Sequence, residues 1–215
     1  AVGKASVPMA RALAEAAGDR LSGGVVVAKR GSGRPVAGLT VIESAHPVPD
    51  ESSLEAGRVV LEAASHVRSE DAVWFALSGG ASSLLESLAP GVQLTDLIDL
   101  NRRMLAEGCA IGEMNERRKR LSQIKAGGLS RAFGQAVQVC FVLSDVIGND
   151  LQTIGSAPML APGVEHRLVG SSLVSLRSTA GDSAGALEAA DRLMQRASPS
   201  AGGANTSAGA RYVPG

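Results

Sequence analysis

Short apolar runs alternate along this chain with longer segments in which apolar residues recur at helical spacing. We expect strands at the apolar runs, which are residues 24–29 (GVVVAK), 39–44 (LTVIES), 73–77 (VWFAL) and, as the last clear strand, 137–143 (VQVCFVL). We expect helices at residues 7–17, at 56–67 after a cap at Asp50, Ser52 or Ser53, and at about 95–108. Strands and helices that alternate in this way indicate a parallel sheet with helices on both faces.

The fold class follows from this alternation. We predict an α/β fold with three α/β/α layers around a mostly parallel, Rossmann-like sheet, occupying residues 1–178. Residues 179–215 are rich in glycine, serine and alanine and lack apolar periodicity, so we expect a disordered tail there. The chain opens at Ala1 without a methionine or a leader segment, and we interpret it as truncated at its start.

Composition narrows the range of partners. The 21 Lys and Arg residues balance 21 Asp and Glu residues, which favours neither nucleic acid nor a membrane surface as the main partner. No apolar run reaches the ~18–20 residues that cross a bilayer. The cysteines, Cys109 and Cys140, lack the spacing of metal ligands and are most simply reduced thiols. Together these features predict a cytoplasmic protein.

The segment VWFALSGGASSLLESL, residues 73–88, has the most informative local pattern. An apolar strand ends there at Ser78, Gly79 and Gly80 follow, and Ser82 lies at the start of a predicted helix. Such a turn lets backbone N–H groups and hydroxyls converge on an anion. An ordinary strand-to-helix connection explains the same pattern equally well, so the segment by itself leaves both interpretations open.

Charged residues near other predicted strand ends are further candidates. Lys4 follows a glycine, where one ammonium group can neutralise a phosphoryl oxygen or a carboxylate. Asp145 and Asp150 follow an apolar strand; they could hold Mg²⁺ beside phosphates, or Asp145 could only cap the next helix. The basic stretch at 115–125 is typical of a solvated helix face, although one or two of its charges could point at phosphate. His46 lies in a stiff extended loop, which favours a structural role.

Several common nucleotide-binding and catalytic motifs are absent. Neither the Gly79-Gly80 turn nor the Gly127-Gly128 turn is followed by the Gly-Lys-Ser/Thr of a Walker A loop, and no GxGxxG fingerprint follows the first strands. No nucleophile elbow is present. The residues by themselves therefore indicate an α/β protein whose anion site is made of glycine turns, Lys or Arg, and one or two Asp side chains.

Five collinear motifs extend this picture. They are Gly3-Lys4-Ala5, residues 43–50 (ESAHPVPD), 77–85 (LSGGASSLL), 115–129 (NERRKRLSQIKAGGL) and 143–158 (LSDVIGNDLQTIGSAP). Together they resemble the class II glycerate kinases, the glycerate 2-kinase family with a DUF4147-type N-terminal domain. The resemblance implies phosphorylation of D-glycerate to 2-phosphoglycerate by ATP, with Mg²⁺ or another divalent cation as cofactor.

The resemblance also implies roles for individual residues. Lys4 corresponds to the motif lysine near the transferred phosphoryl group, Asp145 to a catalytic and metal-binding carboxylate, and Asp150 to a second metal ligand. Phosphate or substrate would bind at Ser78, Gly79, Gly80, Ser82, Asn115, Arg118 and Lys125. Catalysis by such a set consists mostly of positioning and neutralisation of charge.

The chain departs from the family pattern at several positions. Gly148-Asn149-Asp150 replaces Gly-Asp-Asp, Ser156-Ala157-Pro158 replaces Ser-Gly-Pro, and Lys125-Ala126-Gly127-Gly128 shifts the glycines of Lys-Gly-Gly-Arg by one place. The chain is shortened after Pro158, and the C-terminal MOFRL domain that closes the cleft in the family is missing. We therefore expect an incomplete enzyme with half of a site, and little or no turnover by this chain alone.

Two alternatives to a kinase remain. The chain could be a non-catalytic fragment or paralogue that still binds nucleotide or phosphate. It could also be a hydroxypyruvate reductase, although the missing dinucleotide fingerprint argues against that activity. The resemblance is also compatible with a homodimer.

Overall fold

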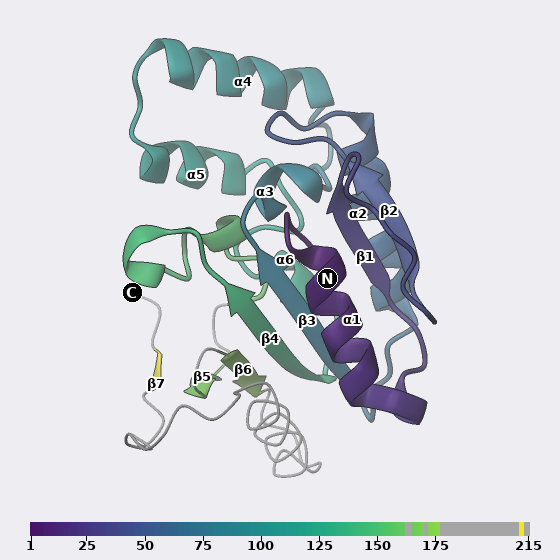
Figure 1. Cartoon of the computed structure of the whole chain (residues 1–215). Helices are drawn as coiled ribbons and strands as arrows, with labels where there is room; N and C mark the ends of the chain where they lie inside the picture. The colour runs from purple at the N-terminus through teal and green to yellow at the C-terminus, as the bar shows by residue number, and fades with distance from the viewer. Residues whose placement is uncertain (162–164, 170–171, 177–210, 213–215) are drawn as a thin grey trace.

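Strands and helices alternate through the first two thirds of the chain. The computed structural model describes residues 1–161, 165–169, 172–176 and 211–212. Its helices are α1 (Ser6–Ala17), α2 (Glu51–Ser65), α3 (Ala81–Leu84), α4 (Leu94–Ala106), α5 (Ile111–Lys119) and α6 (Gly128–Ala132), with short η turns at Gly18–Arg20, Ile147–Asn149 and Ile154–Ser156. Its strands are β1 (Val25–Lys29), β2 (Thr40–Ser44), β3 (Ala72–Ser78), β4 (Val137–Leu143), β5 (Glu165–Val169), β6 (Ser172–Leu176) and β7 (Arg211–Tyr212) (Figure 1).

The residue Val2 joins two pairs of parallel strands. β1 runs parallel to β2, and β3 runs parallel to β4. Val2 lies between the pairs and forms parallel bridges to Val27 of β1 and to Leu77 of β3. The carboxyl ends of these four strands therefore lie at the same end of the sheet, and Gly3 and Lys4 leave the sheet at that end.

Alternate residues of β1 pack against helices on opposite faces of the sheet. Val26 and Ala28 share an apolar cluster with Ala10 of α1, whereas Val27 belongs to a second cluster with Val60 of α2. Figure 1 shows α1 in front of the sheet and α2 behind it. Because successive side chains of a strand point to opposite faces, the apolar run of β1 contacts both helical layers. The prediction of an α/β fold with parallel strands and three layers is confirmed.

The far side of the sheet is antiparallel. β6 pairs with β4, β5 with β6, and β7 with β5, each in antiparallel register. The prediction that 137–143 is the last clear strand is therefore wrong. The sequences of β5 (EHRLV) and β6 (SLVSL) are short and interrupted by polar residues, so they lack the continuous apolar run by which the earlier strands are found. Of the expected tail at 179–215, only Arg211–Tyr212 lies within the described residues.

The helix α2 begins earlier than apolar periodicity indicates. Asp50 caps it: the Asp50 side chain accepts from the Ser52 N–H, and the Ser53 hydroxyl accepts from the Asp50 N–H. This capping box adds a first turn at Glu51, before the apolar positions begin at Ala56. No helix within the described part of the chain is both long and apolar enough to span a membrane.

Candidate functional site

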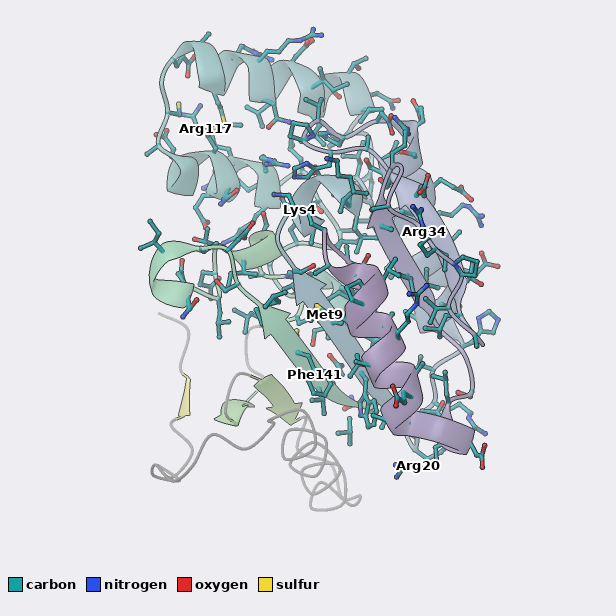
Figure 2. The ribbon with its side chains drawn as sticks, in the orientation of Figure 1. Lys4, Met9, Arg20, Arg34, Arg117 and Phe141 are labelled. Carbon is teal, nitrogen blue, oxygen red and sulfur yellow. The ribbon has the colours of Figure 1, made fainter. Side chains whose placement is uncertain are left out.

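Lys4 and Asp145 face each other at the carboxyl ends of the parallel strands. Lys4 Nζ lies 3.8 Å from Asp145 Oδ2, and the two side chains are 52% and 56% exposed. The Lys4 N–H donates to the Gly79 carbonyl at 2.9 Å, which ties the lysine backbone to the glycine turn. Figure 2 shows Lys4 at the N-terminal end of α1, with Arg20 beyond the opposite end of that helix. Because an exposed pair at this distance interacts weakly, both charges remain accessible to a ligand.

The two glycines of the turn let two side chains approach its backbone. A Cβ atom on Gly79 would lie 1.9 Å from Asp145 Oδ2, so a larger residue would displace the carboxylate. Gly80 has a φ of +86°, and a Cβ atom there would lie 2.8 Å from His46 Cδ2 and 2.9 Å from His46 Nε2. Glycine is therefore needed at both positions to bring Asp145 and His46 against one turn.

His46 joins this group although sequence reasoning favours a structural role for it. It follows β2 by two residues, and its ring is half-buried. Burial, and then the charges of Lys4 and Lys29, lowers the pKa of His46, while Asp145 partly opposes the effect. The signal that could have found it is its place just after a strand end, the same signal that singles out Asp145.

Ser78 binds the first residues of the chain, Val2 and Ala5, next to the Gly79–Gly80 turn. The residue is 2% exposed. Its hydroxyl accepts from the Ala5 N–H at 3.1 Å and donates to the Val2 carbonyl at 3.4 Å. A Cβ atom on Gly3 would lie 2.1 Å from this hydroxyl. Ser78 thus shapes the turn from inside, and its direct contact with phosphate stays a prediction.

A second charged cluster lies just beyond the C-terminal end of α3. Lys125 forms an ion pair with Glu86, and both side chains are 1% exposed. Glu86 Oε1 also accepts from the Ser122 hydroxyl at 2.5 Å. Burial lowers the pKa of Lys125, and Glu86 opposes the effect. The ammonium group that the motif assigns to phosphate binding is therefore paired inside the protein.

Arg118 of α5 lies beside this ion pair with part of its guanidinium unpaired. Its Nη2 donates to the Ser82 carbonyl at 3.4 Å, whereas its buried Nε has no hydrogen-bond partner among the described residues. Burial lowers the pKa of Arg118, and the nearby Glu86 carboxylate opposes the effect. Arg118 and Lys125 thus share one carboxylate, which leaves the cluster with an excess of positive charge.

Asp150 and Asn115 have separate surroundings. The Asp150 carboxylate accepts from the Gln152 N–H at 3.0 Å and from the Thr153 hydroxyl at 2.6 Å, which organises the turn after β4. Asn115 lies one helical turn before Arg118 and is 7% exposed. Within the described ranges, no three His, Cys, Asp or Glu side chains gather in a way that could hold a metal ion. The ligand roles of both residues stay predictions.

Two alanines occupy backbone conformations that favour glycine. Ala126 has a φ of +50° and Ala157 a φ of +57°, at the two positions where the family motifs carry glycine. The loops that contain them bind each other, because the Ala126 N–H donates to the Ser156 carbonyl at 3.0 Å. The Ser156 hydroxyl in turn lies 2.9 Å from the Ser82 hydroxyl. The two departures therefore place alanine in left-handed backbone conformations, at a conformational cost of ~1–2 kcal/mol for each residue.

Comparison with known proteins identifies a family and individual proteins that are similar in sequence to this chain. Residues 1–173 match the family described as a domain of unknown function, DUF4147. The chain is 43% identical over 159 residues to D-glycerate 2-kinase of Thermotoga maritima, a match that covers 74% of this chain and 38% of that protein. It is also 43% identical over 159 residues to an Agrobacterium vitis protein provisionally named hydroxypyruvate reductase, covering 74% of this chain and 41% of that protein.

A solved structure has the same fold. The crystal structure of glycerate kinase from Thermotoga maritima superposes with a TM-score of 0.72 at 37% sequence identity. The superposition covers 94% of this chain and 44% of that one. The chain spans about two fifths of the length of the curated relatives it matches.

Proposed function

Because this chain belongs to the DUF4147 family, we propose that it forms the N-terminal part of an ATP-dependent glycerate kinase that converts D-glycerate to 2-phosphoglycerate. The observation that carries the proposal is the pair of Lys4 and Asp145 above the Gly79–Gly80 turn. A cation, a carboxylate and a glycine-rich backbone turn at one accessible sheet end are the parts that phosphoryl transfer requires.

Lys4 and the glycine turn would hold the transferred phosphoryl group. The Lys4 ammonium is accessible and tied to the turn through its own N–H, so its charge is held near the Gly79–Gly80 backbone. The first amides of a helix have no acceptors within it. The Ser83 and Leu84 N–H groups donate to the Gly80 carbonyl. The Ala81 and Ser82 N–H groups are therefore the ones that can donate to phosphoryl oxygens. Charge that develops on these oxygens during transfer would meet groups that need little rearrangement.

Asp145 is the residue that fits a divalent cation. Mg²⁺ bound to nucleotides takes one or two protein carboxylates and completes its shell with phosphate oxygens and water. Asp145 offers one accessible carboxylate beside Lys4, whereas both oxygens of Asp150 already accept hydrogen bonds in their own turn. When bound, the cation would neutralise phosphate charge. Asp145 would then orient the nucleotide, with Asp150 as a more distant ligand.

The cluster around Arg118 would support the site from behind. Its unpaired Nε and its bond to the Ser82 carbonyl leave the guanidinium able to attract an anion of the substrate or nucleotide. Lys125 and Glu86 would hold this cluster in place through their buried pair. Asn115 would line the same cleft from α5.

Calorimetry with the 215-residue chain is the direct test of the proposal. Mg-ATP, ADP, inorganic phosphate and D-glycerate are titrated separately into the wild type and into Lys4→Met. We expect heat with nucleotide and with glycerate, and weaker nucleotide binding by the variant. No heat with any of the four ligands would overturn the proposed function.

Turnover distinguishes the kinase from the two alternatives. Multiple turnover by this chain should be little or none, but in single-turnover reactions with γ-labelled ATP, which detect one transfer per molecule, we expect slow transfer to D-glycerate that Lys4→Met removes. Binding without any transfer would instead support a non-catalytic nucleotide-binding role. Oxidation of NADH with hydroxypyruvate would favour the reductase, which the provisional name of one relative suggests.

The proposal also includes a C-terminal domain, a homodimer and a cytoplasmic location. In the complete kinase, a C-terminal MOFRL domain would cover Lys4 and Asp145 and exclude water from the transfer. A homodimer and a cytoplasmic location agree with the family resemblance and with the neutral composition of the chain.

A further inference from the structure

The imidazole of His46 lies at the point where the glycine turn meets Lys4. His46 Nε2 is 2.9 Å, and Lys4 Cε 3.4 Å, from the position that a Cβ atom of Gly80 would take. The ring and the lysine therefore approach the same side of one glycine. A group bound to the Lys4 ammonium at this turn lies within reach of the ring.

The loop that carries His46 is held rigidly. The Ala45 N–H donates to the Ser52 hydroxyl at 3.1 Å, and Asp50 caps α2. Arg30, just after β1, donates to Asp50 Oδ2 at 3.0 Å. These contacts tie the loop to both β1 and α2, so the loop backbone that carries His46 is held in place.

Both ring nitrogens of His46 are without a hydrogen-bond partner within residues 1–161 and the other described segments. His66 provides a contrast, because its Nδ1 lies 2.8 Å from the Glu62 carbonyl at the end of α2. Solvent reaches the His46 nitrogens, because neither is among the fully buried atoms that lack a partner. They are therefore available to a group bound at the glycine turn.

From this geometry we infer that His46 is a catalytic residue that accepts the hydroxyl proton of the substrate through Nε2. The inference rests on the proposed function. As the glycerate oxygen bonds to the γ-phosphorus, the bond from that phosphorus to the bridging oxygen breaks, and its electron pair leaves on ADP. The hydroxyl proton passes to His46, and solvent then removes it.

The charges around the ring favour this role. Lys4 and Lys29 are the cations near His46, and Asp145 is the nearby anion; the cations and burial together keep the imidazole neutral at neutral pH. A neutral imidazole has one nitrogen lone pair that can accept a proton. Asp145 is the competing acceptor, but it already faces the Lys4 ammonium at 3.8 Å.

The test follows the imidazole signals of the ¹⁵N-histidine-labelled chain by NMR, with D-glycerate added in the presence of Mg-ADP. Propionate, which keeps the carboxylate but lacks both hydroxyls, is the matched ligand. His46→Asn assigns the signal, and His66→Asn is the control variant. We expect D-glycerate, but not propionate, to shift the His46 Nε2 resonance and to leave His66 unchanged.

Calorimetry on the variants completes the test. We expect His46→Asn and His46→Gln to bind D-glycerate about five- to tenfold more weakly, with unchanged ADP binding, because one hydrogen bond is lost. The inference is overturned if the wild type binds D-glycerate without a shift of the His46 resonance, or if both variants bind D-glycerate with unchanged affinity. Neither result would overturn the proposed kinase function. Absence of D-glycerate heat in the wild type would overturn both.

Discussion

Glu86 and Lys125 form an ion pair whose two side chains are each 1% exposed. The pair joins the segment after α3 to the loop before α6, and the Ser122 hydroxyl gives Glu86 a further hydrogen bond. A motif lysine is thus engaged in the interior, while the accessible lysine of the site is Lys4. The two lysines should therefore respond differently to substitution.

Replacing Lys125 should cost folding stability. Lys125→Met leaves the buried Glu86 carboxylate without its partner, and we expect a loss of about 3–5 kcal/mol in the free energy of unfolding. The double variant Lys125→Met/Glu86→Leu should recover only part of it, because the buried carboxylate is gone but Arg118 then lacks its nearby counter-charge. Urea unfolding followed by circular dichroism measures both. A stable single variant with impaired nucleotide binding would instead identify Lys125 as a ligand.

Replacing Lys4 should impair transfer without affecting folding. Its side chain is half exposed, so Lys4→Met should change the free energy of unfolding by less than about 0.5 kcal/mol. The rate of phosphoryl transfer should fall by about 10²–10³, as expected when one stabilising charge is lost. Arg102→Met removes an exposed cation paired with Asp99 on α4 and is the control. Equal rates in the two variants would contradict the role of Lys4.

The Gly79 position should tolerate no side chain if Asp145 is to keep its place. In Gly79→Ala the new Cβ atom would lie 1.9 Å from Asp145 Oδ2, and the flexible carboxylate must move away. We expect little change in stability but a roughly 100-fold slower transfer, since a misplacement of about 1 Å has that effect. Gly112→Ala, where no atom lies within 4 Å of the new Cβ, should leave the rate unchanged. Single-turnover kinetics compare the two variants.

Glycine at position 126 should stabilise the protein. Ala126 has a φ of +50°, so Ala126→Gly relieves the steric strain, but glycine loses more conformational entropy on folding, and the net gain in the free energy of unfolding should be about 0.5–1 kcal/mol. Ala157→Gly should gain less, because Ala157 is buried and its methyl packing is lost. Ala63→Gly, in the last turn of α2, should lose up to about 1 kcal/mol. Thermal unfolding ranks the stability of the three variants. A lower stability of Ala126→Gly than of the wild type would contradict backbone strain at that residue.

The stability of the protein should depend on pH through His46. Its pKa is lower in the folded than in the unfolded chain, mainly because of burial. Between the unfolded value of about 6.5 and the lower folded value, the unfolded chain binds more protons, so acidification through this window destabilises the fold. His46→Gln should remove this part of the pH dependence. Urea unfolding midpoints of the wild type and of His46→Gln at several pH values test this prediction. The same dependence of the midpoint on pH in both proteins would contradict it.

Local sequence patterns were sufficient for the central strands. The apolar runs at 24–29, 39–44, 73–77 and 137–143 match β1 to β4 to within one residue at each end. β1, β3 and β4 carry buried residues on both faces, and burial of that kind requires a largely apolar run. β2 is only partly buried and keeps Thr40 and Glu43 exposed. β5 and β6 lack such a run, and the antiparallel pairing of β6 with β4 depends on long-range contacts that no local pattern records.

The same contrast between local sequence patterns and long-range contacts applies to the candidate site. Sequence by itself determined the residue types at the strand ends: Lys4, the Gly79–Gly80 turn and Asp145 all follow strands whose ends a parallel sheet brings together. Only the tertiary structure decided which of the charged residues are accessible. It buries Lys125 against Glu86, a residue with no distinguishing local pattern, and it places His46 on Gly80. The physical reason is that the accessibility and pairing of a charge depend on neighbours distant in sequence, whereas strand and turn formation depend largely on adjacent residues.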